Sequence, residues 1–269
     1  MELRDKEFNQ IREYLKEHYG ISMGKEKRTL IFSRLRPLLK QKGFNDFADY
    51  FDYLISDKTG EASVVFVNRL TTNHTFFMRE PEHFEFLKNK ALPWVEEKFG
   101  AQKDLRLWCA ACSSGEEAYT LQMIVQDYFE KKPGWNLEIL ATDISERVLQ
   151  QATLGIYSNE SLKPMHEHWL KKHFIKYDSD NMIVKDDLKK LITYRKFNLK
   201  EEKLPFKKPF HIIFCRNVMI YFDNSTREAL VNRFYNVLEN DGYFFIGHSE
   251  SLSNVNTKFK YVMPAVYKK

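Results

Sequence analysis

A chain of 269 residues, of which 43% are hydrophobic and 29% charged, is long enough for one large globular domain or two modest ones. No apolar run approaches the roughly 20 residues of a transmembrane helix, and residues 1–7 lack the apolar core of a secretion signal. Three cysteines, an odd number, indicate a reducing compartment without a disulfide framework, so a cytoplasmic location is expected. The formal net charge of +5 is modest, and the placement of the basic residues matters more than their total.

Residues 1 to about 70 are predicted to form a small helical domain, because apolar residues recur at helical spacing in successive segments. Gly20 closes the first segment, and Asn45 is expected to cap the third. The second segment is rich in cations. Such a segment is typical either of a surface helix whose charges are solvated or of a basic surface that attracts an acidic partner. An acidic protein surface fits better than nucleic acid, because few aromatic residues lie between the charges and no nucleic-acid-binding motif is recognised. Its cations are Lys25, Lys27, Arg28, Arg34, Arg36 and Lys40.

Residues 70–81 hold Asn73, Thr75 and Arg79 among bulky apolar residues, just before a helix that Pro81 opens. Polar side chains in such surroundings either have their hydrogen bonds satisfied inside a junction between domains or line a pocket. The composition of this stretch leaves both interpretations open.

Residues 105–143 have the pattern of a nucleoside-binding βαβ unit. The short apolar run 105–110 indicates a buried parallel strand, and the small residues 111–115 allow a tight turn before a helix that starts at Glu116. A second strand, residues 137–141, is followed by Asp143, which could accept hydrogen bonds from ribose hydroxyls. The turn carries one glycine, so a nucleoside without phosphates fits better than a phosphate-binding loop, and an ordinary strand-to-helix turn is the alternative.

Cys109 and Cys112 form a C-x-x-C pair inside this unit. They lie at the end of a strand, and the sequence offers no second metal-binding pair. Zinc or redox chemistry is therefore not favoured, and no metal is expected.

The rest of the chain continues an α/β pattern with one interruption. Residues from 155 to about 195 are predicted to form an inserted subdomain with a hairpin whose turn contains Asx residues. Tyr261 and Val266 mark a closing antiparallel hairpin. Candidate ligand groups recur where core strands end, which is where open α/β sheets bind ligands: Asp143, Asn198, Asn217 and His248. His248, with Ser249 and Glu250, either lines the site or forms a turn after the last core strand.

Five stretches carry a resemblance to a known family: TTNHTFFMRE (71–80), AACSSGEEAY (110–119), ATDIS (141–145), IFCRNVMIYFD (213–223) and GHSESLS (247–253). The chain resembles the CheR family, the chemoreceptor glutamate methyltransferases of bacterial chemotaxis. The resemblance covers nearly the whole chain, and the long CRNVMIYF match is highly specific.

The resemblance implies a class I (Rossmann-like) methyltransferase of the α/β class. It implies a receptor-contacting helical domain over residues 1–70, a linker over 71–93 that contributes to the cofactor site, and a methyltransferase domain over 94–269 with the subdomain at about 155–195. The implied reaction moves a methyl group from S-adenosylmethionine to glutamate side chains of methyl-accepting chemotaxis proteins. The products would be glutamate methyl esters and S-adenosylhomocysteine, and the implied role is sensory adaptation.

Family positions also imply roles for individual residues. Arg79 and Tyr221 match the pair near the transferred methyl group, and Lys27, Arg28, Arg34 and Arg36 match the face laid against the receptor's cytoplasmic helical bundle. The cofactor contacts implied are Asn73, Thr75, Arg79, Glu117, Asp143, Asn198, Leu199, Arg216 and Asn217.

Two departures from the family pattern are visible. Cys112 and Ser113 stand where some relatives have Ala-Ser, a mild change within a small-residue turn. The subdomain hairpin has a short turn without glycine, which argues against the receptor-tail tethering of some relatives.

Two other classes of function stay open on the residues alone. One is a binding module that holds the nucleoside as a signal, and the other is a nucleic-acid methyltransferase that would bind its substrate in a salt-sensitive way. The resemblance favours the receptor methyltransferase, and we expect a monomer that neither binds nucleic acid nor inserts into a membrane.

Overall fold

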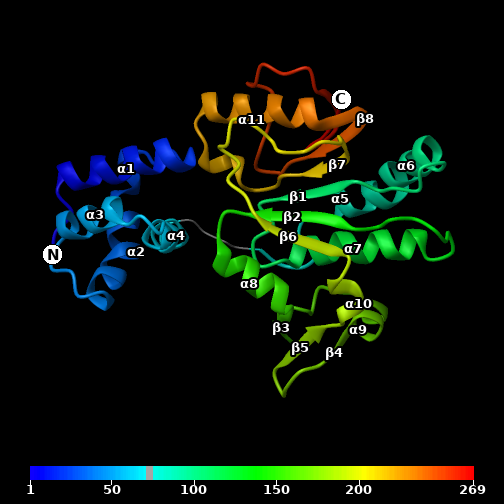
Figure 1. Ribbon diagram of the computed structural model, residues 1–269, viewed down its shortest axis with the longest axis horizontal. Coiled ribbons are helices and arrows are strands. Elements are labelled where there is room, and N and C mark those ends of the chain that lie inside the picture. The colour runs from blue at the N-terminus through cyan, green and yellow to red at the C-terminus, as the bar shows by residue number, and fades with distance from the viewer. Residues whose placement is uncertain (71–74) are drawn as a thin grey trace. The chain divides into compact units, whose positions relative to one another are not determined.

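The computed structural model describes residues 1–70 and 75–269, which form two compact units (Figure 1). The smaller unit contains residues 1–70 together with Tyr221–Arg227. The larger unit contains Thr75–Ile220 and Glu228–Lys269. Over the described ranges, no helix combines the length and the apolarity needed to cross a membrane.

The smaller unit is helical, as predicted. Its apolar stripes bury residues such as Leu15, Leu35 and Phe66 in a common core. Gly20, at φ 70°, ends the first helix in the left-handed conformation that glycine adopts without strain. The predicted cap of the third helix was wrong by one residue, because Asp46 rather than Asn45 accepts the backbone N–H of Asp49. The helices are α1 (Asp5–Tyr19), α2 (Arg28–Gln41), α3 (Phe47–Ser56) and α4 (Glu61–Leu70), with a 3-10 turn at Lys25–Lys27.

The segment Tyr221–Arg227 belongs to this unit although it lies about 150 residues further along the chain. The Ser22 backbone N–H donates to the Tyr221 carbonyl at 2.7 Å, and Ile21 forms a β-bridge with Phe222. Lys16 pairs with Asp223 at 3.1 Å. The helical unit is therefore completed by a piece of chain that follows the CRN motif.

The larger unit contains a seven-stranded sheet with the order β6-β2-β1-β7-β8-β10-β9. Five neighbours, from β6 to β8, run parallel, and β10 and β9 are antiparallel. This is the predicted α/β, Rossmann-like class with its closing hairpin. The strands are β1 (Leu107–Ala110), β2 (Ile139–Asp143), β6 (Ile192–Lys196), β7 (Phe210–Phe214), β8 (Leu238–Phe245), β9 (Lys260–Met263) and β10 (Val266–Lys268).

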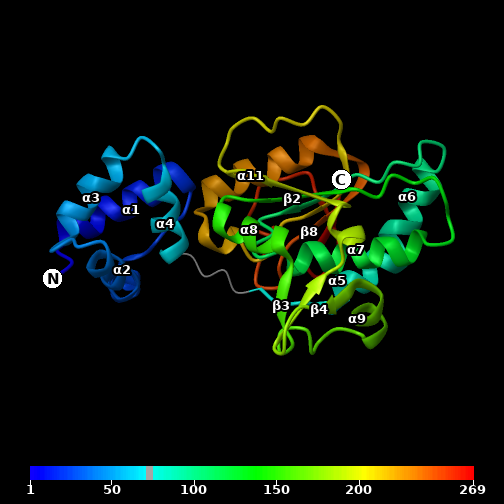
Figure 2. The same cartoon turned by 60° about the horizontal axis from the view of Figure 1, so that its bottom comes forward.

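Helices cover both faces of the sheet, with α7 and α8 on one side and α11 on the other (Figures 1 and 2). Successive residues of a strand point to opposite faces, so Leu107 and Cys109 join the core that includes α7, while Trp108 packs against Phe234 of α11 at 5.2 Å between ring centroids. These helices are α7 (Glu116–Phe129), α8 (Glu146–Leu154) and α11 (Asn224–Val237), with a 3-10 turn, η3, at Met219–Tyr221.

Residues 75–93, which include most of the predicted linker, belong to the larger unit and contain the helix that was expected to open at Pro81. Phe84, Leu87 and Ala91 are buried in the same core as β1 and α7, because their apolar side chains repeat at helical spacing, and Phe77 joins this core from the turn before α5. The elements are α5 (Pro81–Phe86), a π-helical turn at Leu87–Ala91 and α6 (Leu92–Phe99).

The inserted subdomain is a three-stranded sheet with the order β3-β5-β4. Its hairpin closes on the expected Asx turn, since the Asp178 carboxylate accepts the backbone N–H groups of Asp180 and Asn181, both at 2.8 Å. The third strand, β3, was not expected. The elements are β3 (Ile156–Ser158), α9 (Glu167–His173), β4 (Phe174–Lys176), β5 (Asn181–Val184) and α10 (Asp186–Lys189).

We expect Gly115→Ala to destabilise the larger unit by about 2–4 kcal/mol, as measured by urea unfolding. Gly115 has φ 97°, and an added Cβ would lie 2.8 Å from the Cβ of Ala152 and 2.9 Å from the hydroxyl of Tyr157. Gly134→Ala is the matched control, because its φ is 89° but the nearest atom is the flexible Lys103 Nζ at 3.3 Å. Equal losses of unfolding free energy in the two variants would contradict the packing argument.

Candidate active site

The candidate site lies at the carboxyl edge of the parallel strands. β1, β2 and β7 are neighbours in the sheet, so the residues that follow them meet at one edge. The order in which strands are added to the sheet also changes direction at β1, because β2 lies on one side of β1 and β7 lies on the other. Open α/β sheets bind ligands at such a switch point.

The turn from β1 to α7 holds Asp143 in place. Ala111, Ser113 and Gly115 all have positive φ, at 62°, 51° and 97°, so the turn aims backbone N–H groups toward the neighbouring strand. Ser113 N–H donates to Asp143 Oδ2 at 2.9 Å, and Ser145 N–H donates to Oδ1 at 3.0 Å. Burial raises the pKa of Asp143, and these backbone hydrogen bonds oppose that rise.

Arg216 lies in the centre of a network of charged groups. Its side chain is 1% exposed, and it lies two residues after the end of β7. Nη1 donates to Glu117 Oε2 at 2.6 Å, and Nη2 donates to Glu80 Oε2 at 2.9 Å and to the Arg79 carbonyl at 2.5 Å. Burial alone would lower the pKa of Arg216, but the two carboxylates raise it. The guanidinium therefore stays charged and connects three segments of the chain.

Glu80 reaches this network from an unusual backbone conformation. Its φ of 58° is left-handed, and it immediately precedes Pro81 at the start of α5. Glu80 Oε1 also accepts from Asn217 Nδ2 at 3.3 Å. Burial would raise the pKa of Glu80, but the charge of Arg216 lowers it, so the carboxylate stays ionised.

Glu250 holds the loop that follows Arg216. Its Oε2 accepts the backbone N–H groups of Asn217 at 3.0 Å and Gly247 at 2.5 Å, and its Oε1 accepts those of Met219 at 2.7 Å and Ile220 at 3.3 Å. Burial raises the pKa of Glu250, and these N–H groups act against the rise. One carboxylate thus fixes the backbone of the loop from residue 217 to residue 220.

Several predicted cofactor residues come together, and others are placed separately. Arg216 and Asn217 both donate to Glu80, and Glu117 joins the network through Arg216. Asn198, after β6, accepts the Lys200 backbone N–H at 3.0 Å, and the carbonyl of the buried Leu199 accepts from Arg233 at 2.8 Å. Thr75 and Arg79 are half-buried, and the Arg79 guanidinium lies 5.7 Å from the Phe76 ring centroid. Asn73 lies outside the described residues.

Arg79 and Tyr221 belong to different units, so their pairing beside the transferred methyl group stays a prediction. Sequence reasoning missed Glu80 although the residue is part of the quoted motif at 71–80. The signal that could have identified Glu80 is a carboxylate next to an arginine at the start of a helix. Glu250 was noted only as part of a possible site lining or turn.

The cysteines in this region are thiols. Burial raises the pKa of Cys109 and Cys112 well above the usual range, and the Cys109 Sγ–H donates to Glu117 Oε1 at 3.2 Å. A thiol that stays protonated is a poor nucleophile and a poor metal ligand. The C-x-x-C pair therefore contributes to the packing of the core, and Cys109 also helps to hold Glu117 through its hydrogen bond.

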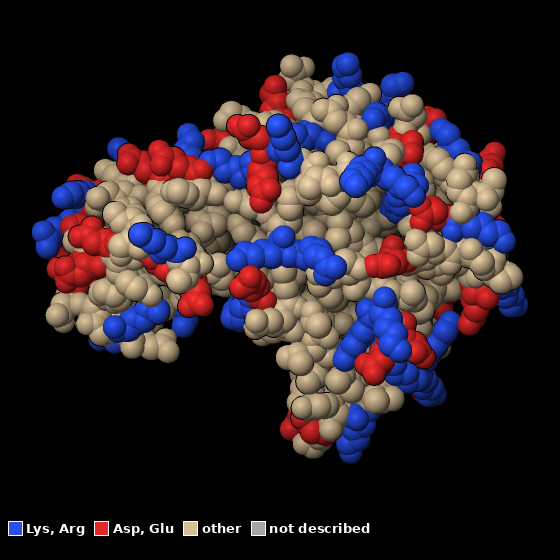
Figure 3. Space-filling view, in the orientation of Figure 1, with Lys and Arg blue, Asp and Glu red and all other residues tan. Residues whose placement is uncertain are grey.

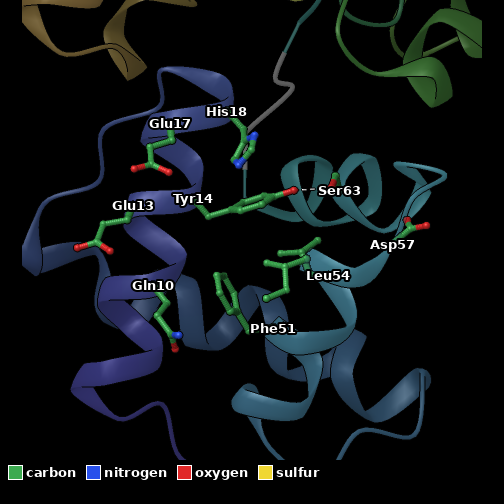
Figure 4. A pocket seen from close by; sticks show the side chains of 10 residues that line it. Gln10, Glu13, Tyr14, Glu17, His18, Phe51, Leu54, Asp57 and Ser63 are labelled. Atoms are coloured by element: carbon green, nitrogen blue, oxygen red, sulfur yellow. Dashed lines mark hydrogen bonds between the residues drawn. The ribbon is translucent and has the colours of Figure 1, made fainter.

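The helical unit has a hollow of its own between α1, α3 and α4 (Figure 4). Its volume is about 540 Å³, and Glu13, Glu17 and Asp57 give its lining an acidic character. Tyr14 and Ser63 bridge it by a hydrogen bond of 2.5 Å. Among the residues that the structure describes, none of the predicted cofactor residues lines this hollow.

We expect Glu250→Gln to lower the free energy of unfolding by about 1–3 kcal/mol and to weaken S-adenosylhomocysteine binding about 10-fold. The amide NH₂ would face a backbone N–H group and leave that donor without an acceptor. Urea unfolding and isothermal titration measure the two effects. Glu160→Gln, at an exposed surface pair with Lys163, is the control and should change neither quantity. Unaltered binding in Glu250→Gln would contradict the positioning role.

Comparisons with known proteins agree with this geometry. Residues 73–267 match the family described as CheR methyltransferase, SAM binding domain, and residues 6–71 match CheR methyltransferase, all-alpha domain. A chemotaxis protein methyltransferase of Borreliella burgdorferi is 43% identical, covering 94% of this chain and 90% of that protein. The chemotaxis protein methyltransferase of Escherichia coli is 34% identical, covering 98% and 91%. The chain belongs to the CheR family of methyltransferases that use S-adenosylmethionine.

Proposed function

We propose that this protein transfers a methyl group from S-adenosylmethionine to glutamate side-chain carboxylates of chemoreceptors, for sensory adaptation. The products are glutamate methyl esters and S-adenosylhomocysteine. The observation that carries the proposal is the network of Arg216, Glu117 and Glu80 at the switch point of the sheet, within a chain that matches a relative over 94% of its own length. Both relatives named above are described as chemotaxis protein methyltransferases, which supports a receptor as the substrate.

The chemistry of the side chains fits the cofactor. Asp143 is an ionisable carboxylate at the end of β2, suited to ribose hydroxyls. Glu117, held by Arg216, is suited to an ammonium group such as that of a methionine moiety. Because the Arg216 side chain is 1% exposed and engaged with two carboxylates, it acts on the cofactor mainly by orienting them. Family position assigns the remaining contacts to Asn73, Thr75, Arg79, Asn198, Leu199 and Asn217.

The reaction needs no base from the protein. Bound S-adenosylmethionine supplies an electrophilic methyl group on a positively charged sulfur. A receptor glutamate is ionised near neutral pH, so a carbon–oxygen bond forms as the carbon–sulfur bond breaks, and no proton moves. The two opposite charges disappear during this step, which favours a site that excludes water and holds the reacting atoms in line.

Arg79 and Tyr221 are assigned positioning roles. Arg79 can orient a carboxylate through two parallel N–H donors, and Tyr221 can donate one hydrogen bond to the attacking oxygen. Neither should neutralise the substrate, because a carboxylate that is bound too strongly is a weaker nucleophile.

Two cations of the predicted receptor face are expected to supply most of its attraction for an acidic receptor surface. Lys27 and Arg36 are exposed, whereas Arg28 pairs with Asp5 and Arg34 donates to the Leu70 carbonyl at 2.5 Å. The face of the helical unit seen in Figure 3 mixes acidic and basic side chains. A docking site for an acidic helical bundle would therefore occupy only part of this surface. Lys27 and Arg36 are the best candidates for its basic residues.

The setting inferred for this reaction is the cytoplasm, with the protein acting as a monomer. The three free, buried cysteines support a reducing compartment.

A labelled-methyl assay tests the reaction. We expect S-adenosylmethionine with receptor-bearing membranes to give label that mild alkali releases as methanol, because carboxyl methyl esters hydrolyse in base. Replacement of the receptor glutamates by alanine should remove this label. Tight cofactor binding without alkali-labile label on a competent receptor would rule out the proposed reaction.

Tyr221→Phe and Arg79→Ala are each expected to lower kcat roughly 10- to 100-fold in this assay, with the fold retained by circular dichroism. Tyr261→Phe is the matched control, because Tyr261 is 65% exposed on the edge strand β9. Full activity of Tyr221→Phe would remove that residue from the reaction.

The double variant Lys27→Glu and Arg36→Glu is expected to raise the KM for receptor about 10-fold at low salt and to leave the KM for S-adenosylmethionine unchanged. Lys58→Glu, an exposed lysine in the same unit, is the control. An equal effect of the control would show that overall charge, and not this face, governs docking.

A further inference from the structure

Two imidazoles and one carboxylate converge beside the charged network. Glu80 precedes α5, His83 lies within α5, and His248 follows β8. One ligand atom from each side chain lies within 4.8 Å of those of the other two. The described residues contain no other group of three histidine, cysteine or acidic side chains arranged in this way.

His83 has fewer partners than a buried imidazole normally has. Its side chain is fully buried, and neither ring nitrogen reaches a described residue with normal hydrogen-bond geometry, although the Pro264 carbonyl lies close enough to interact with the ring. Nδ1 faces Glu80 Oε2 at 3.5 Å, and the ring lies 4.7 Å from that of His248. A buried polar group without a good partner is unfavourable, so an ion or another ligand on a ring nitrogen of His83 would account for its retention.

The surroundings of His83 suit a ligand to a metal. The Pro264 backbone carbonyl lies beside the ring and can act as an acceptor for one N–H. Histidine ligands commonly give one N–H to a carbonyl and turn the other nitrogen to the metal.

We propose that Glu80, His83 and His248 form a site for a divalent transition metal of the zinc class. Two imidazoles and a carboxylate are donors that such ions take, whereas Mg²⁺ and Ca²⁺ prefer oxygen. His248 is exposed and provides the approach from solvent.

The site is coupled to the cofactor site through Glu80. Arg216 Nη2 lies 2.9 Å from Glu80 Oε2, so a metal ion on this carboxylate competes with the guanidinium. The positive charge of Arg216 also opposes the ion, which makes the site one of moderate affinity. A bound metal would loosen Arg216, and with it Glu117, and so weaken cofactor binding. This coupling rests on the proposed cofactor contacts, whereas metal binding does not.

Co²⁺ serves as the spectroscopic probe, added to the full chain and displaced by Zn²⁺. We expect one Co²⁺ per chain, with a visible ligand-field spectrum that Zn²⁺ abolishes. His248→Gln should weaken Co²⁺ binding at least about 10-fold without unfolding the protein, because the side chain is exposed. His166→Gln is the matched control, since His166 is an exposed histidine 5.9 Å from His168 between ring centroids and represents an ordinary surface site.

Equal Co²⁺ affinity in the wild type and in His248→Gln, or loss of Co²⁺ binding in His166→Gln, would contradict the proposed metal site. The coupling is measured by titrating S-adenosylhomocysteine with and without Zn²⁺. Zn²⁺ should raise the Kd about 5-fold or more in the wild type and leave it unchanged in His248→Gln. An unchanged Kd in the wild type, with metal bound, would overturn the coupling alone.

Discussion

An arginine whose side chain is 1% exposed, held between two carboxylates, is the interaction on which the active site depends. Arg216 comes from the end of β7, Glu117 from the first turn of α7, and Glu80 from the start of α5. Removing one partner from such a buried group leaves an uncompensated charge, which costs about 3–5 kcal/mol. The residues proposed to assemble the cofactor site therefore also hold the larger unit together.

Much of the fold was predictable because each element carries its own local signal. β1 and β7 are uninterrupted apolar runs, and Gly115 marks the turn that follows β1. Asp143 was predictable for the same reason, since a carboxylate at a strand end is visible without any knowledge of its partners. The third strand of the subdomain, β3, is three residues long and too short for a periodic pattern.

The charged network was only partly predictable, because its partners are far apart in the chain. Glu80 and Arg216 are separated by 136 residues, and Glu80 depends on a left-handed backbone that sequence patterns do not indicate at a non-glycine residue. Glu250 accepts hydrogen bonds from backbone N–H groups. Because nearly every residue has such a group, these contacts do not show in the pattern of side chains. The helix that opens at Pro81 was predictable, because proline is favoured in the first turn of a helix.

The segment Tyr221–Arg227 has a consequence for how the chain can be divided. The helical unit is discontinuous, because the chain leaves the larger unit after Ile220 and re-enters it at Glu228. A fragment cut near residue 70 would lack the strand-like partner of Ile21 and the carboxylate that pairs with Lys16. The complementary fragment would carry residues 221–227, which include the start of α11, without their packing surface. Genetic separation at the apparent domain boundary would therefore damage both pieces.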